Sequence, residues 1–180
     1  MTVGPSGIPP GPIEEFLEIL QAHGIVQLVD IRTMPRSRYN PQYNGDALSA
    51  ALDGRNIRYL HLPELGGLRR ARPDSPNTGW RNASFRGYAD YMQTPELERG
   101  LAALIQVAAE APAAMMCAEA VPWRCHRSLV ADALVVSEIG VQHIQNTGEA
   151  AAHQLTPFAV VEGTVIVYPR AGKLDAPTLF

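Results

Sequence analysis

The chain has 180 residues, of which 46% are hydrophobic and 18% are charged, and its formal net charge is −3. These values are typical of a globular protein and exclude a disordered chain, and the length predicts one domain over residues 1–180. No apolar run reaches about 18 residues, which excludes a membrane-spanning helix. Residues 1–12 are rich in Pro and Gly and lack the pattern of a signal peptide, so we expect a flexible start and a cytoplasmic protein.

The first half of the chain predicts two helices and two strands between loops. Pro12 suits the first turn of a helix, the apolar residues that follow recur at helical spacing, and Gly24 is a typical helix end. Short apolar runs predict buried strands, and Pro35 and Pro41 predict a loop. The predicted elements are a strand stub at 2–3, a helix from about 12 to 23, a strand at 25–31, a loop at 34–44, a helix at 46–52 and a strand at 57–62.

The second half opens with a long loop at residues 63–84, rich in Gly, Pro, Asn and Arg, and loops of this length are usually functional. The elements predicted after it are helices at 85–93 and 95–110, a strand at 113–117, a helix at 122–139 before Gly140, a strand at 141–144 and a hairpin or two short strands at 160–168 around Gly163. Strands that alternate with helices predict an α/β fold, with a mainly parallel sheet covered by helices on both faces.

The predicted topology brings polar residues together at one edge of the sheet. The strand ends at Asp30, His61 and Cys117 would share the edge where open α/β sheets keep their sites. Residues 32–86 also hold ten arginines against four acidic residues. Guanidinium groups suit phosphate and carboxylate, so the sequence predicts an arginine-rich, anion-binding cleft, although a solvated loop surface would show the same composition.

Both cysteines lie in residues 116–127, where a strand gives way to a helix. If Pro122 is near the first helical position, Cys125, His126 and Arg127 fall in the first turn of that helix. The dipole and the neighbouring cations would then lower the pKa of Cys125, as in nucleophilic or redox cysteines. The alternative is a buried Cys125, because it shares a helix face with Leu129.

Two further interpretations use Cys117 together with Cys125. The thiols could form a redox pair, or they could bind a metal with His126 and a distant His61 or His143. The seven residues between them match neither a C-x-x-C motif nor the usual zinc spacing. We therefore predict no metal ligand and no cofactor, and keep a thiol- or metal-based sensor as an alternative.

Segments along most of the chain resemble the bacterial family catalogued as domain of unknown function 488. They are residues 29–32, 35–38, 40–41, 59–67, 85–88, 117–119, 125–127 and 155–158. The resemblance implies a cytoplasmic α/β protein and no established reaction. Members of the family tend to open with a Thr-Ile-Gly-His-Ser-like segment, whereas this chain has Pro5 in place of the histidine.

The preferred function is an enzyme or binding protein for a phosphate-bearing small molecule or nucleotide. A nucleic-acid-binding module is the other alternative, because Trp80, Phe85 and Tyr88 interleave with arginines, although the pI near 5.9 argues against it. Whether the protein is an enzyme stays open, and so does its oligomeric state. The candidate catalytic residues are Cys125, Glu119, Asp30 and His126, and the candidate ligand-binding residues are Arg32, Arg36, Arg38, Arg127, His61, Gly66 and Gly67.

Overall fold

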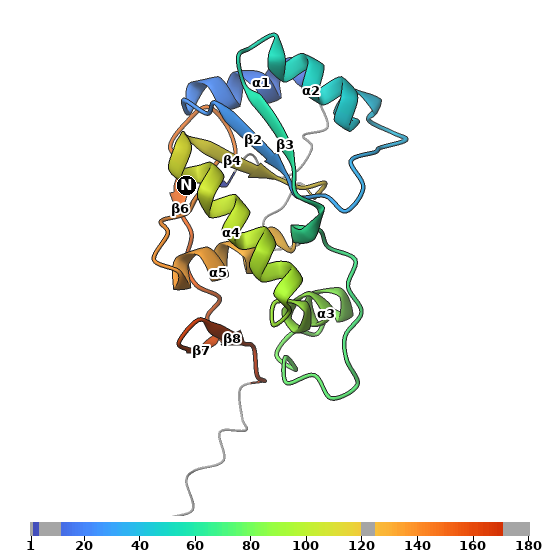
Figure 1. Ribbon diagram of the computed structural model, residues 1–180, viewed down its shortest axis with the longest axis vertical. Helices are drawn as coiled ribbons and strands as arrows, with labels where there is room; N and C mark the ends of the chain where they lie inside the picture. Colours follow the sequence, from blue (N-terminus) through green and yellow to red (C-terminus); the bar gives the residue numbers. More distant parts are fainter. Residues whose placement is uncertain (1, 4–11, 120–124, 171–180) are drawn as a thin grey trace, which may run out of the picture.

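A central sheet of six strands runs through the part of the chain that the computed structural model describes, residues 2–3, 12–119 and 125–170 (Figure 1). In order across the sheet, the strands are β3 (Arg58–His61), β2 (Gln27–Asp30), β4 (Ala113–Met116), β1 (Thr2–Val3), β5 (Gln142–His143) and β6 (Ala151–Ala152). Neighbouring strands are parallel except β5 and β6, which pair antiparallel. The predicted mainly parallel sheet is confirmed.

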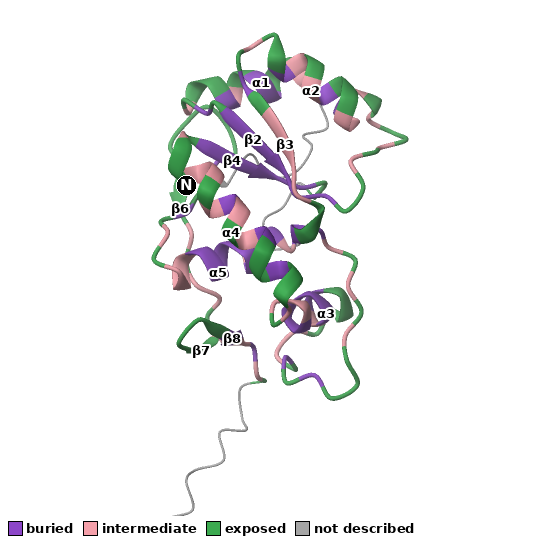
Figure 2. Cartoon of the chain, viewed as in Figure 1, coloured by how far each residue is buried: buried purple, intermediate pink, exposed green. Residues whose placement is uncertain are grey.

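Helices cover both faces of this sheet, as predicted (Figure 1). They are α1 (Ile13–Ala22), α2 (Gly45–Asp53), α3 (Ala83–Tyr91), α4 (Pro95–Glu110) and α5 (Arg127–Val136). Because side chains alternate along a strand, Leu28 of β2 packs with α1 and α2, whereas Val29 packs with α4 and α5. Every residue of β2 and β4 is buried, and both strands are purple in Figure 2. Within the described ranges, no helix is long and apolar enough to cross a membrane.

Local signals account for several element ends. Gly24 follows α1 with a φ of +64°, a backbone conformation that glycine adopts without strain. The Thr94 side chain accepts a hydrogen bond from the Leu97 N–H at the start of α4. The predicted hairpin is confirmed as β7 (Val160–Glu162) and β8 (Val165–Val167), with Gly163 at a φ of +62° in the turn.

Helix α5 corrects one prediction. It begins at Arg127 and ends at Val136, whereas the sequence predicted a helix over 122–139. Cys125 and His126 therefore lie just before the helix and not inside its first turn, and the predicted start near Pro122 falls outside the described residues, as does Pro5. Pro is common at helix starts, but it does not fix which following residue is the first in the helix.

A buried polar cluster joins α5 to the C-terminal segment. Asp132 is fully buried in α5 and accepts hydrogen bonds from the Thr156 N–H and hydroxyl, the Tyr168 hydroxyl at 2.9 Å and His153 Nε2 at 2.8 Å. His153 Nδ1 lies 2.8 Å from Nε2 of His143 in β5. The cluster therefore anchors the segment that leads to the hairpin.

We expect His143 to make the stability depend on pH. Burial, then the charges of His153 and Arg127, lower the pKa of His143 from 6.5 to about 4. An unfolded chain takes up this proton near pH 6.5 but the folded protein does not, so stability is full above pH 6.5 and falls as the pH drops toward 4. For this half-exposed ring we expect a loss of about 1 kcal/mol between pH 7 and 5, measured by urea unfolding. His143→Gln should remove that part of the loss, and an unchanged loss in the variant would contradict the assignment.

Candidate functional site

Three neighbouring strands end at the same edge of the sheet and bring the predicted polar residues together. In the strand register, Asp30 at the end of β2 lies opposite His61 of β3 and Met116 of β4. Cys117 follows Met116 directly, so it lies next to the end of β2, while His61 lies on the other side of Asp30. This juxtaposition at the carboxyl ends of parallel strands is the one that the sequence predicted.

Asp30 and Arg32 form a buried ion pair at this edge. The Asp30 carboxylate accepts hydrogen bonds from Arg32 Nη2 at 2.5 Å, from Arg32 Nε at 2.9 Å and from the Tyr59 hydroxyl at 2.8 Å. Burial lowers the pKa of Arg32, but the hydrogen bond and charge of Asp30 outweigh it, so the net shift is upward. Burial and the Asp30 charge also raise the pKa of Tyr59. With these donors in place, the carboxylate fixes the guanidinium in one orientation.

The remaining contacts of Arg32 leave one nitrogen of its guanidinium without a hydrogen bond among the described residues. Arg32 Nη2 also donates to the Tyr43 carbonyl at 2.8 Å, and His61 Nε2 donates to the Arg32 carbonyl at 2.8 Å. Arg32 is only 4% exposed, yet its Nη1 has no hydrogen-bond partner among the described residues. A buried guanidinium nitrogen without a partner is a costly arrangement that a ligand could relieve.

A cavity of about 390 Å³ opens at this point. Its lining residues are Arg32, Thr33, Met34, Arg36, Ser37, Asn40, Gly67, Leu68, Cys117, Ala118, Glu119 and His126. Of the predicted site residues, Arg32, Arg36, Gly67, Glu119 and His126 line it, whereas Asp30, His61, Gly66, Arg38, Cys125 and Arg127 do not. The functional roles predicted for these residues stay predictions.

The sequence interpretation missed the polar side chains of the loop after β2. Ser37 and Asn40 are fixed there, because the Ser37 N–H donates to Asn44 Oδ1 and the Asn40 N–H donates to Ser37 Oγ. The signal that could have found these residues is their place between Arg36 and Pro41, in a loop that leaves a strand carboxyl end.

Gly66 and Gly67 allow the loop after β3 to approach the rest of the site. A Cβ on Gly66 would lie 2.5 Å from Thr33 Oγ1, and a Cβ on Gly67 would lie 2.9 Å from His126 Nδ1. The Thr33 hydroxyl donates to the Gly67 carbonyl at 3.0 Å. The two glycines thus bring three segments of the chain into contact, and one of them, Gly67, lines the cavity.

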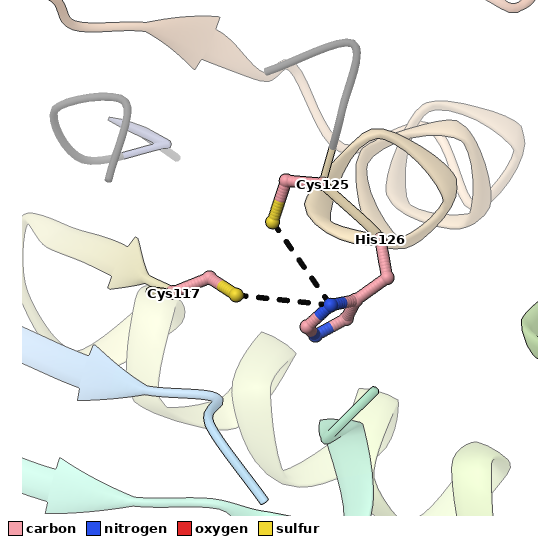
Figure 3. A group of neighbouring side chains, drawn as sticks. All are labelled: Cys117, Cys125 and His126. Atoms are coloured by element: carbon pink, nitrogen blue, oxygen red, sulfur yellow. Dashed lines mark hydrogen bonds between the residues drawn. The ribbon is translucent and has the colours of Figure 1, made fainter. Parts of the chain in front are cut away.

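Cys117, Cys125 and His126 form a close cluster beside the cavity (Figure 3). His126 Nδ1 lies 3.7 Å from Cys117 Sγ and 3.9 Å from Cys125 Sγ. Both thiols are free, and Cys117 and Cys125 are 5% and 1% exposed. The ring of His126 packs against Tyr88, with 4.8 Å between the ring centroids.

The two thiols differ in acidity, and the prediction for Cys125 is wrong. A hydrogen bond from Cys125 and a further one from His126 lower the pKa of the Cys117 thiol. Burial, then the neighbouring Cys117, raises the pKa of the Cys125 thiol. The predicted acidification of Cys125 assumed a place in the first turn of a helix, whereas the residue lies before the helix and is buried, as the alternative interpretation expected.

Arg127 lies inside the protein and not in the wall of the cavity. It is 0% exposed, and its Nη2 donates to the Glu119 carbonyl at 3.0 Å. Its backbone N–H donates to Cys125 Sγ at 3.5 Å. These bonds tie the start of α5 to the segment after β4, while the Glu119 residue itself is exposed at the cavity.

Two of the three aromatic residues of the nucleic-acid alternative belong to the core, and the third packs against it. Phe85 and Tyr88 are buried, and the Trp80 ring packs on Phe85 with 4.7 Å between centroids and on Phe158 with 4.9 Å. Phe85 and Tyr88 are therefore not available for stacking a base, whereas Trp80 is partly exposed. Two residues of the long loop at 63–84, Gly67 and Leu68, line the cavity instead.

No curated protein matches the chain, and no solved structure matches it. The family model described as "Domain of unknown function DUF488" matches residues 12–134. This range contains the strand ends, the loop after β2 and the Cys117–Cys125–His126 cluster. Because the match spans more than half of the sequence, the chain belongs to the DUF488 family.

Proposed function

We propose that the cavity at the carboxyl ends of β2 and β4 binds an anionic small molecule that carries a phosphate group, such as a nucleotide or a sugar phosphate. The observation that carries the proposal is Arg32. Its guanidinium is fixed by Asp30 in the wall of the cavity, and its Nη1 has no hydrogen-bond partner among the described residues. A guanidinium that is held in place before binding suits phosphate, because the entropic cost of ordering it is already met by the fold.

The size and the other donors of the cavity support the same class of ligand. A volume of about 390 Å³ falls in the range of small-molecule sites. Arg36 adds a second guanidinium and forms no ion pair among the described residues. Thr33, Ser37 and Asn40 add hydroxyl and amide groups that can hydrogen-bond phosphate or sugar oxygens.

The same cavity offers groups for chemistry on the bound molecule. Glu119 is exposed at its wall and is the proposed general acid or base, and Cys117 and His126 lie at the wall as well. We propose binding of the phosphate-bearing molecule. A reaction at Glu119, Cys117 or His126 would follow that binding.

Arg36→Ala tests the proposal by isothermal titration with inorganic phosphate, nucleoside monophosphates and sugar phosphates. We expect at least one of these probes to bind the wild type, and the variant to bind it about tenfold more weakly, because one charge-assisted hydrogen bond is lost. Arg38→Ala is the matched control: it removes the same charge from the same loop at an exposed residue outside the lining. We expect at most about a twofold change there.

Two outcomes would contradict the proposal. One is the absence of binding for every probe. The other is an equal loss in Arg36→Ala and Arg38→Ala, which would indicate general attraction to a positive surface and not a site in the cavity.

A further inference from the structure

We propose that Cys117 Sγ, Cys125 Sγ and His126 Nδ1 bind one zinc ion. The three atoms all lie within 4.8 Å of one another, and they converge from two segments, the end of β4 and the start of α5 (Figure 3). The spacing in the sequence argued against a metal. The three ligands nevertheless meet, because one follows the end of β4 and the other two lie just before α5.

The distances match those of a tetrahedral site. Ideal zinc bond lengths place a sulfur and a nitrogen ligand about 3.6 Å apart and two sulfurs about 3.8 Å apart. The observed distances from His126 Nδ1 are 3.7 Å to Cys117 Sγ and 3.9 Å to Cys125 Sγ. The two sulfurs lie within 4.8 Å of each other. A zinc ion would therefore fit between the three atoms after small shifts of the side chains.

The donor atoms suit zinc and exclude magnesium and calcium. Thiolate and imidazole ligands suit zinc, whereas magnesium and calcium require oxygen ligands. The Arg127 backbone N–H points to Cys125 Sγ, and the Tyr88 ring supports the His126 ring. Such contacts keep ligand atoms in the orientation that a metal needs.

The fourth coordination position faces the cavity. Within the described ranges, no other His, Cys, Asp or Glu joins the cluster. Residues 120–124 are Ala, Val, Pro, Trp and Arg, none of which has a side chain that ligates zinc. Cys117 and His126 line the cavity, whereas Cys125 does not. Three protein ligands and an open position are typical of catalytic zinc, which polarises a substrate oxygen or activates a water molecule. This last step rests on the proposed function, whereas the zinc site itself does not.

Metal analysis of the untagged protein, purified without chelators, tests the inference. We expect about one zinc per chain, and a loss of most of it in Cys117→Ala and in His126→Ala. His23→Ala is the control, because this histidine hydrogen-bonds to the Asn146 carbonyl away from the cluster, and its zinc content should stay at the wild-type level. Circular dichroism of each variant separates loss of the site from loss of the fold.

Cobalt titration of the metal-free wild-type protein gives a second readout that needs no variant. Binding by two thiolates should produce a sulfur-to-cobalt charge-transfer band together with the visible bands of tetrahedral cobalt. Less than about 0.1 zinc per chain together with no such band would overturn the inference. Phosphate binding by the metal-free protein would then still support the proposed function, so the two failures are distinguishable.

Discussion

Replacing Asp30 with alanine is expected to lower the free energy of unfolding by about 3–5 kcal/mol. Asp30 and Arg32 are 0% and 4% exposed, so the substitution leaves a guanidinium buried without its counter-charge. The Tyr59 hydroxyl loses its acceptor at the same time. Because whole domains are stabilised by about 5–15 kcal/mol, urea unfolding of Asp30→Ala should show a large shift of the midpoint.

Two control variants distinguish the stability effect of this buried ion pair from that of an exposed one. Glu110→Ala breaks the exposed pair with Arg58, whose N···O distance is 3.5 Å, and should change stability by less than about 0.5 kcal/mol. The double variant Asp30→Leu/Arg32→Met removes both charges and should recover much of the stability while losing phosphate binding. A loss below about 1 kcal/mol in Asp30→Ala would contradict the expectation that the substitution leaves a buried guanidinium without its counter-charge.

The fold was largely predictable because its signals are local. Apolar runs mark the buried strands β2 and β4, and Gly24 and Gly163 mark backbone turns that other residues adopt only with strain. Strand β6 was missed because two exposed alanines carry no strand signal, and their pairing with β5 depends on the tertiary structure. The start of α5 was misplaced because Pro122 fits a helix start without specifying one.

The sequence predicted the edge of the sheet at which the site lies, but not which side chains line the cavity. Asp30, His61 and Cys117 could be placed together because parallel strands end side by side. Which arginine lines the cavity depends on how the loops fold: Arg36 does and Arg38 does not, although both follow the same strand. The pKa of Cys125 could not be predicted because burial decides its direction, and burial depends on packing between α5 and β4.

A second large loss of stability is expected when Asp132 is replaced. Asp132→Ala should lower the free energy of unfolding by at least about 4 kcal/mol, because His153, Thr156 and Tyr168 all donate to this one buried carboxylate. Asp132→Asn keeps the shape but loses the charge and one acceptor oxygen, and should cost about 2 kcal/mol. Asp53→Ala, an exposed aspartate at the end of α2, should stay within about 0.5 kcal/mol in the same urea experiment.

The position of Asp132 also predicts where the Asp132→Asn protein loosens. Asp132 joins α5 to the segment that leads to β7 and β8, whereas α1 and α2 pack on the opposite face of the sheet. Amide hydrogen exchange should therefore accelerate in α5 and in the hairpin together, and stay slow in α1 and α2. A uniform acceleration through all the helices would contradict this local role. Because α5 begins directly after His126, loosening of this helix should also disturb the Cys117–Cys125–His126 cluster.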